Sequence, residues 1–247
     1  MLKKIILLFK IGRKLSTSGA ISSIYEIYTP PVGVKILFFI IGFNLGEKKI
    51  LNKQSPGEKL CKALQEMGTT FIKLGQFLAT RPDIIGENIS KELEKLQDKL
   101  PPFEISEAKK ILKNELGEKN FLEIKNLSEP VAAASIAQVH FAKINDSDNE
   151  VAIKILRPNI EKIFNDELDA LMLLAYIVQF FLKKTKRLKL IEVVQLLREV
   201  TNVEMDLRFE AAAANELKEN TKNDLGFKVP KIYWNQTSKK VLCLDRI

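Results

Sequence analysis

Histidine and cysteine are scarce in this sequence. Its 247 residues include a single histidine, His140, and two cysteines, Cys61 and Cys243. The cysteines have no metal-like spacing and suggest no disulfide scaffold, so we interpret them as buried thiols in a reducing compartment. A lone histidine cannot make a metal site without partners, and a hydrogen-bonded structural role is favoured for it. The sequence therefore predicts no metal site of its own.

Long hydrophobic runs are missing as well. The apolar run at residues 36–41 is far shorter than the roughly 20 residues that a membrane-spanning helix needs. Near the start, Lys10 interrupts the run from Ile5 to Phe9 and no small-residue cleavage site follows, which argues against a secretion signal. Internal repeats, low-complexity tracts and nucleic-acid-binding signatures are absent from the sequence too. We therefore expect neither a transmembrane helix nor a nucleic-acid partner.

Positive charge is concentrated near the N-terminus. The net charge is +8, and residues 1–50 hold eight Lys or Arg against only Glu26 and Glu47. In residues 2–15 the apolar side chains lie broadly opposite the basic ones on a helical wheel, as in helices that bind at a membrane interface. Residues 1–54 are thus predicted to be a basic, apolar lead that binds a membrane surface. Packing of both apolar runs on the rest of the protein is the alternative.

Helix signals dominate much of the chain that follows. A capping-box pattern at Ser55 and Glu58, with Pro56 at the first helical position, predicts that a helix begins there. Ser106 is a further candidate cap, and Gly117 is a candidate helix end. With the apolar periodicity, these signals predict helices at residues 56–80, 89–100, 106–117, 160–182 and 190–220.

The most informative stretch runs from Val131 to Lys154. A turn of small residues at 132–135 leads into an alternating run, and after a polar turn the strand VAIKIL carries Lys154. A turn without bulky side chains lets backbone N–H groups approach phosphate oxygens, and the strand lysine adds positive charge. VAIK is the phosphate-binding lysine motif of protein kinases, although alanines here occupy the loop where an ordinary kinase has glycines. Strands are predicted near residues 138–144, 150–156 and 240–246.

A polar stripe lies on the predicted helix 56–80. Thr69, Lys73, Gln76 and Thr80 recur at helical spacing opposite the leucines. An ordinary solvent-exposed face is the simpler interpretation of such a stripe. Gly75 favours a special role, because a mid-helix glycine costs about 1 kcal/mol relative to alanine and is expected where another group packs closely.

A cluster of carboxylates lies on the last predicted helix. Asp206 and Glu210 are four residues apart and would share a face, with Glu204 nearby on the same helix. Such carboxylates can pair with the strand lysine or hold Mg²⁺. A surface salt bridge between Arg208 and Glu204 is the simpler alternative by spacing alone. The alanine run at residues 211–214 predicts close packing, most simply against the strands.

Four motifs occur in an order that is typical of one family. Residues 73–76 read KLGQ and match a KxGQ motif, and residues 132–140 read AAASIAQVH, an alanine-rich loop with its continuation. Residues 151–154 match VAIK, and residues 204–206, which read EMD, match an ExD motif. Any one motif is weak, but four in register are specific. From about residue 30 to its end, the chain resembles the UbiB family of atypical kinase-like proteins.

The resemblance implies an α+β fold. A helical N-terminal extension over residues 55–125 would carry the KxGQ motif, and residues 126–247 would form a protein-kinase-like N-lobe with a small antiparallel sheet and helices. A complete kinase-like protein also has a catalytic-loop Asp, an Asn for metal and a DFG-type Asp in a C-terminal lobe. No HxD-with-Asn pattern follows Lys154, so we assign no catalytic residue and expect the C-lobe to be absent. The chain would be a fragment, a split-gene product, or a protein that has abandoned catalysis.

The resemblance also assigns the site. Lys154 would bind the α- and β-phosphates, and Glu210 resembles the helix-C glutamate that pairs with that lysine. Lys73 and Gln76 resemble an extension helix that folds over the active site, with Lys73 facing Glu204 of the ExD motif, which Asp206 completes. The loop over the phosphates would comprise Val131, Ala132, Ala133, Ala134, Ser135, Ile136, Ala137, Gln138 and Val139.

The function that the resemblance implies is support of ubiquinone biosynthesis at a membrane, here the cytoplasmic side of a bacterial inner membrane. The cofactor would be ATP or ADP, with Mg²⁺ in the complete protein. Closure of the extension would exclude protein substrates and favour ATPase or lipid-coupled activity. Expected partners are adenine nucleotide, a membrane surface or isoprenoid lipid, and ubiquinone-biosynthesis proteins. The alternative is a non-catalytic, membrane-associated helical module that binds partners or quinone precursors.

Overall fold

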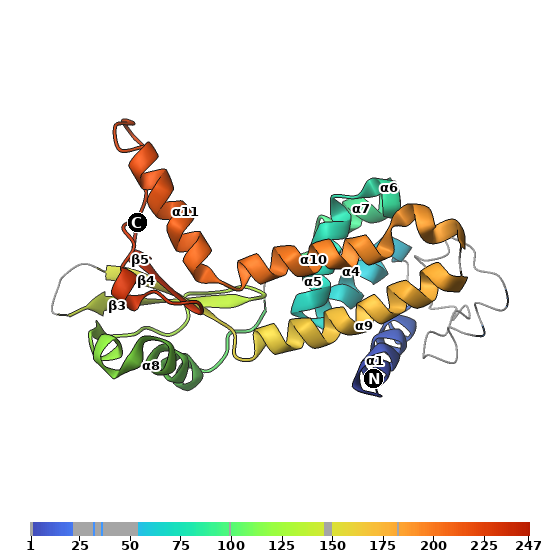
Figure 1. The fold of residues 1–247 in the computed structure, drawn as a ribbon, viewed down its shortest axis with the longest axis horizontal. Coiled ribbons are helices and arrows are strands. Elements are labelled where there is room, and N and C mark those ends of the chain that lie inside the picture. The colour runs from blue at the N-terminus through green and yellow to red at the C-terminus, as the bar shows by residue number, and fades with distance from the viewer. Residues whose placement is uncertain are drawn as a thin grey trace. The chain divides into compact units, whose positions relative to one another are not determined.

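The computed structural model describes residues 2–21, 54–98, 100–145, 150–181 and 183–247, together with positions 32 and 36. The chain forms two compact units, Met1–Asp98 with Lys162–Arg198 and Lys99–Glu161 with Glu199–Ile247. The described part of the first unit is helical, and the second unit holds a five-stranded sheet. This combination of helices with one small sheet confirms the predicted α+β class (Figure 1).

The first unit is built from amphipathic helices. Helices α4, α5 and α7 pack against one another, and Leu64 and Phe71 from the predicted apolar stripe are buried between them and their neighbours. The elements of this unit are α1 (Leu2–Thr17), α4 (Pro56–Met67), α5 (Thr69–Ala79), α6 (Pro82–Ile85), α7 (Glu87–Leu93), most of α9 (Ile160–Phe181), η1 (Lys183–Leu188) and the start of α10 (Leu190–Glu204).

The capping box at the start of α4 is confirmed. The Glu58 N–H donates to the Ser55 side-chain oxygen at 3.1 Å, and the Ser55 N–H donates to the Glu58 carboxylate at 2.7 Å. The single helix predicted over residues 56–80 is wrong, however, because Gly68 interrupts it with φ 96 and ψ −163. Only glycine adopts such a backbone conformation without strain. The chain therefore turns at Gly68 and starts a second helix, α5, at Thr69.

Three other predicted helices are corrected at their boundaries. The helix predicted at 89–100 is α7, which ends at Leu93. The next helix, α8 (Ile105–Leu122), has Glu104 rather than Ser106 at its cap position, and Gly117, with φ 75, kinks it instead of ending it. The helix predicted at 190–220 is two helices, α10 and α11 (Leu207–Asn220), which are separated by an extended residue, Asp206.

Gly75 lies where helix α5 is closely packed, as its mid-helix position predicts. A Cβ atom at this position would overlap with the Leu96 side chain and approach the Leu64 Cδ1 atom to 2.9 Å. Both leucines are buried. The glycine is therefore required by close packing within the helical unit.

The second unit contains the predicted strands. Its antiparallel sheet has the strand order β1-β3-β4-β5, with β2 also paired to β3. The strand VAIKIL lies in β4, which confirms that part of the prediction. The elements are α8, β1 (Ile124–Lys125), β2 (Ala132–Ala133), β3 (Ala137–Ile144), β4 (Glu150–Leu156), α11, η2 (Trp234–Gln236) and β5 (Val241–Asp245). Strand β5 confirms the strand predicted near residues 240–246, and the segment before it contributes only an isolated bridge from Ile232 to Leu244.

The two faces of the sheet have different neighbours. Helix α8 covers one face, and α11 rises from the other (Figure 1). Because side chains alternate along a strand, the residues of β4 that precede and follow Lys154 face α8, and Lys154 faces the side of α11. The core under α8 consists of Ala108, Leu112, Leu116, Ala142, Ile144, Val151, Ile153, Ile155, Val241 and Cys243.

The two cysteines differ in burial. Cys243 is fully buried in β5, and burial together with the nearby Asp245 carboxylate raises the pKa of its thiol to about 12. Cys61 is only half-buried on α4. The prediction of two buried thiols is therefore correct for Cys243 alone.

Replacement of Gly75 by alanine tests the close packing. We expect Gly75→Ala to lower the free energy of unfolding by about 1 kcal/mol, because overpacking costs about 1–3 kcal/mol while the gain in helix propensity is at most about 1 kcal/mol. In the Leu96→Ala background the new methyl group has room, so the double variant should lose less stability than the sum of the single changes. Urea denaturation followed by circular dichroism measures all four proteins, and strict additivity would contradict the contact.

Candidate functional site

Lys154 and Glu210 form the centre of the candidate site. The Lys154 Nζ donates to both carboxylate oxygens of Glu210, at 3.0 and 2.8 Å. The lysine comes from the middle of β4, opposite Val139 on β3 and Leu242 on β5. The glutamate comes from the first turn of α11, where the helix dipole favours a negative charge. The predicted pair is confirmed.

The Lys154–Glu210 pair is partly exposed to solvent. The side chain of Lys154 is 29% exposed and that of Glu210 is 50% exposed. Exposed ion pairs contribute about 0–1 kcal/mol to stability because water screens them. The pair therefore does little for folding, but it holds the ammonium group at an accessible point above the sheet.

The alanine-rich loop closes onto the same sheet. Strand β2 pairs with β3, and the Val131 N–H donates to the Val139 carbonyl at 2.9 Å. Within the turn, the Ala134 N–H donates to the Ala137 carbonyl at 2.8 Å. Val131 and Ala132 are exposed, whereas the residues at 135–138 are buried. The loop is thus a tight hairpin with its first residues at the surface.

Arg157 fixes this loop, and the sequence analysis missed it. Its guanidinium donates to the Ala134 carbonyl at 3.0 and 2.8 Å and to the Leu100 carbonyl at 3.3 Å. Its own N–H donates to the Ile136 carbonyl at 2.9 Å. The available signal was an arginine directly after the VAIKIL strand, since a planar group with several donors can bind two carbonyls at once.

A buried polar network supports the hairpin from the α8 face. The Gln138 amide accepts from the Phe103 N–H at 2.8 Å and donates to the Phe103 carbonyl at 3.1 Å. The same amide nitrogen lies 2.9 Å from the His140 Nε2, and the His140 Nδ1 lies 2.8 Å from the Ser128 carbonyl. Because the amide nitrogen can only donate, Nε2 accepts and Nδ1 carries the proton. The structural role predicted for His140 is confirmed, and the Gln138 side chain lies in this interior network.

Asp206 caps α11 instead of lying on a helical face. Its carboxylate accepts from the Arg208 N–H at 3.2 Å and from the Arg208 guanidinium at 2.9 and 2.6 Å. The hydrogen bond from the Arg208 side chain lowers the pKa of Asp206 below its ordinary value. Arg208 therefore pairs with Asp206, not with Glu204 as the surface-bridge alternative supposed, and Glu204 ends α10.

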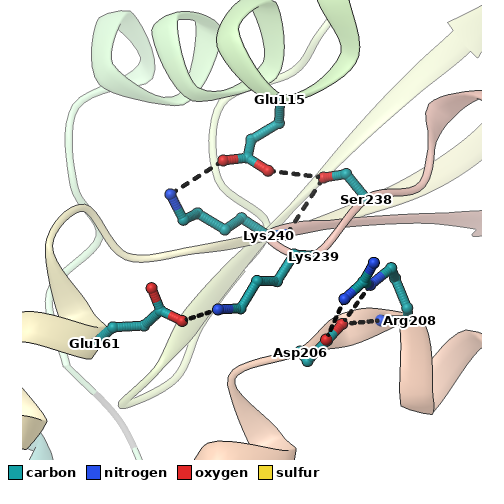
Figure 2. Close-up of polar contacts among 7 residues, drawn as sticks. All are labelled: Glu115, Glu161, Asp206, Arg208, Ser238, Lys239 and Lys240. Atoms are coloured by element: carbon teal, nitrogen blue, oxygen red, sulfur yellow. Dashed lines mark hydrogen bonds and ion pairs between the residues drawn. The ribbon is translucent and has the colours of Figure 1, made fainter.

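The turn before β5 ties the start of α11 to the sheet. The Leu207 N–H donates to the Lys239 carbonyl at 2.9 Å, and the Leu156 N–H donates to the Lys240 carbonyl at 3.0 Å. The side chains of this turn bind acids on two other helices, since Lys240 and Ser238 contact Glu115 at 3.0 and 3.2 Å and Lys239 contacts Glu161 (Figure 2). The sequence analysis did not identify these contacts. The turn places α11, and hence Glu210, over Lys154.

Lys73 and Gln76 lie on α5 in the first unit, where both are half-buried. Thr69, from the same predicted stripe, is buried. Thr80, the last member of the stripe, is exposed, so the stripe is only partly buried. Glu204 belongs to the second unit, and the pairing of Lys73 with Glu204 stays a prediction.

Comparison with known proteins identifies the class. A model of the ABC1 atypical kinase-like domain matches residues 95–247, which include β1 to β5 and the Lys154–Glu210 pair. The match covers more than half of the chain. This protein is therefore a member of the ABC1 family of atypical kinase-like proteins. Its similarity to UbiB proteins supports the same assignment.

The curated relatives are bacterial proteins named "Probable protein kinase UbiB". One from Marinobacter nauticus is 36% identical over 220 residues, which cover 88% of this chain and 39% of the relative. One from Pseudomonas aeruginosa is 39% identical over 194 residues, with 77% of this chain and 36% of the relative covered. One from Cellvibrio japonicus is 38% identical over 194 residues, with 78% and 35% covered. The chain thus spans less than two-fifths of the length of these relatives.

Removal of the Asp206 cap should destabilise the fold in a pH-dependent way. Asp206→Ala is expected to lower the free energy of unfolding by about 1–2 kcal/mol near neutral pH, because it removes an N-cap and the partner of Arg208. The pKa of Asp206 is lower in the folded state, so its contribution is present above the ordinary value of 3.8 and is lost as the pH falls through the lowered value. Chemical denaturation at neutral and at acidic pH measures the difference.

A matched control is Asp83→Ala. Asp83 also binds an arginine two positions away, Arg81, at 2.7 and 2.8 Å, but it makes no cap and is largely exposed. Its replacement should change the stability much less than Asp206→Ala, because water screens an exposed ion pair. Equal losses for the two variants at neutral pH would contradict the capping role of Asp206.

Substitution of Arg157 should loosen the alanine-rich loop. Arg157→Lys cannot bind the Ala134 and Leu100 carbonyls in the same way, because a lysine amine lacks the planar fork of donors. We expect amide hydrogen exchange of Val131 and Ala134 to become roughly tenfold faster. Arg246→Lys is the control, since Arg246 pairs with Glu150 at the other end of β4. If amide exchange is unchanged in Arg157→Lys, the hairpin keeps its structure without the guanidinium of Arg157.

Proposed function

We propose that this chain forms the lysine-bearing part of an ATP-binding atypical kinase or ATPase that supports ubiquinone biosynthesis. Membership of the ABC1 family supports this proposal. The observation that carries it is the Lys154–Glu210 pair, held above a sheet whose neighbouring hairpin is made of small residues. This pair has no large structural value, so its accessible ammonium group is best explained by a ligand with negative charge.

The residues fit the phosphates of ATP or ADP. Lys154 would bind the α- and β-phosphates, with Glu210 fixing the direction of its amine. The exposed start of the loop, at Val131 and Ala132, has no bulky polar side chain and lets a ligand approach the backbone. When bound, Mg²⁺ would neutralise phosphate charge, with its ligands in the complete protein. Within the residues that the structure describes, no group of three acidic, histidine or cysteine side chains could hold a metal ion.

The KxGQ and ExD motifs supply the proposed regulation. Lys73 and Gln76 would belong to a cover over the nucleotide, with Lys73 paired to Glu204 beside the Asp206 cap. Such a cover would exclude large substrates and favour ATP hydrolysis or a lipid-linked reaction over protein phosphorylation. The half-burial of Lys73 and Gln76 supports a specific role for them.

Membrane association is the second part of the proposal. In α1, Lys3 and Lys4 bind Asp166 and Asp169 of α9 at 2.5 and 2.9 Å, so these cations face the rest of the unit. Leu2, Ile5, Ile6 and Phe9 are instead 44–72% exposed. In the described part of the chain, no helix has both the length and the apolar character needed to cross a bilayer. We propose that α1 binds at a membrane surface, near isoprenoid lipid and other ubiquinone-biosynthesis proteins.

The exposed apolar side chains of α1 also favour the second candidate function, a membrane-associated helical module without catalysis that binds partners or quinone precursors. The two functions differ in one respect: only the first requires Lys154 to contact a nucleotide.

Calorimetric titration of the purified chain with Mg-ATP and Mg-ADP tests the nucleotide proposal. We expect weak binding, with a dissociation constant on the order of 0.1–1 mM, because one wall of a cleft leaves the ligand largely hydrated. Lys154→Ala should weaken binding at least about tenfold. We expect no ATP hydrolysis above background, since residues 1–247 contain no HxD-with-Asn pattern after Lys154.

Lys125→Ala is the matched control, because Lys125 is an exposed strand lysine on β1 at the edge of the same sheet. It should leave binding unchanged. Absence of any binding by the unmodified chain would favour the non-catalytic module. Hydrolysis that depends on Lys154 would show that this chain carries its own catalytic residues and would overturn the expectation of binding alone.

A further inference from the structure

The turn between α9 and α10 carries an exposed aromatic surface. Tyr176, Phe180 and Phe181 are 54%, 77% and 54% exposed. The Phe180 and Phe181 rings contact each other edge to face, with centroids 5.0 Å apart. A hollow of about 480 Å³ beside them is otherwise lined by Ile177, Gln179, Lys186 and Ile191. We call these residues, with Arg187 and Lys189, the aromatic tip.

Exposure of this kind calls for a partner. Burial of aromatic rings is among the largest favourable terms in folding, and adjacent exposed rings form a patch rather than scattered surface residues. The tip lies at the end of α9, and the helix buries Phe164, Leu168 and Ala170 further back along its length. The same helix thus has an interior half and a half whose aromatic residues face solvent.

The charge around the tip selects the partner. Lys186, Arg187 and Lys189 are exposed, and the sequence from Gln179 to Ile191 contains no acidic residue. Cations beside aromatic rings match an anionic, partly apolar surface, where rings enter the headgroup region and cations bind lipid phosphates. A second copy of the chain is disfavoured as occupant, because two such tips would bring like charges together.

We propose that the aromatic tip inserts into the surface of a bilayer that contains anionic lipids. The inference deepens the membrane part of the proposed function and rests on it, but not on nucleotide binding. This membrane contact would be separate in sequence from α1, since α1 covers Leu2–Thr17 and the aromatic tip lies between Tyr176 and Ile191. Phe180 and Phe181 would enter the interface, and Lys186 and Arg187 would bind headgroup phosphates.

Vesicle binding tests the proposal. The purified chain is sedimented with sucrose-loaded vesicles of phosphatidylcholine alone and with 30% phosphatidylglycerol. We expect binding to the anionic vesicles, and about tenfold weaker partitioning for the Phe180→Ser/Phe181→Ser variant. Lys186→Glu/Arg187→Glu should reduce binding to the anionic vesicles and weaken its dependence on salt. Phe227→Ser is the control, since Phe227 is as exposed as Phe181 but lies in the other unit.

A fluorescence measurement locates the contact. The chain has one tryptophan, Trp234, so Trp234→Phe with Phe180→Trp places a single reporter at the tip. Its emission should shift to shorter wavelength on anionic vesicles and be quenched by brominated lipid chains. A control with Phe227→Trp in the same background should show neither effect. Circular dichroism and thermal melting confirm that each variant is folded.

The outcomes separate the two claims about the membrane. If the chain binds vesicles and the tip variants bind equally well, the tip proposal is overturned while α1 keeps its role, which Ile5→Ser/Phe9→Ser then tests. If the chain binds no vesicles at all, both claims fall. If light scattering shows a dimer that the tip variants abolish, the occupant is a second copy and the proposal is wrong. None of these results depends on Lys154, so the nucleotide proposal is judged separately.

Discussion

The interruption of the last long helix at Asp206 determines the geometry of the candidate site. Because the Asp206 carboxylate caps α11 and binds Arg208, the chain leaves the direction of α10 and starts a new helix beside β5. The backbone bond from Leu207 to Lys239 fixes that new start against the sheet. Glu210, one turn further on, then lies within hydrogen-bonding distance of Lys154. If one unbroken helix ran through this region, the position of Glu210 would follow from the direction of α10. The sheet would then not fix it beside Lys154.

The sequence predicted those parts of the fold that depend on local chemistry. The capping box at Ser55 and the three main strands follow from residue type and spacing. The pairing of Lys154 with Glu210 was implied by the resemblance to the kinase-like family, and the structure contains it. The prediction from sequence failed where the backbone conformation of one glycine determines whether a helix is interrupted, as at Gly68 and Gly117. Glycine permits such an interruption but does not require it. The prediction failed also for Asp206, whose i+4 spacing to Glu210 is equally consistent with a helix interior and with a cap.

Contacts between distant segments explain what else was missed. Arg157 binds a carbonyl 23 positions earlier in the chain, and Lys240 binds an acid on α8. Neither arginine nor lysine at these positions has a local pattern that identifies its partner, because surface cations are common and their partners depend on tertiary structure. The alanine-rich loop shows the same limit. Its composition indicates a close approach of backbone and ligand, whereas its rigidity comes from a guanidinium outside the motif.

The buried thiol of β5 gives the protein a natural reporter of its own opening. Cys243 is enclosed between the sheet and α8, and its high pKa keeps it in the unreactive protonated form. An alkylating reagent can reach it only when α8 or β5 moves away from the rest of the sheet. The rate at which this thiol is modified would therefore measure how often the sheet unit opens locally, without any label or engineered residue. The more accessible Cys61 supplies an internal reference in the helical unit.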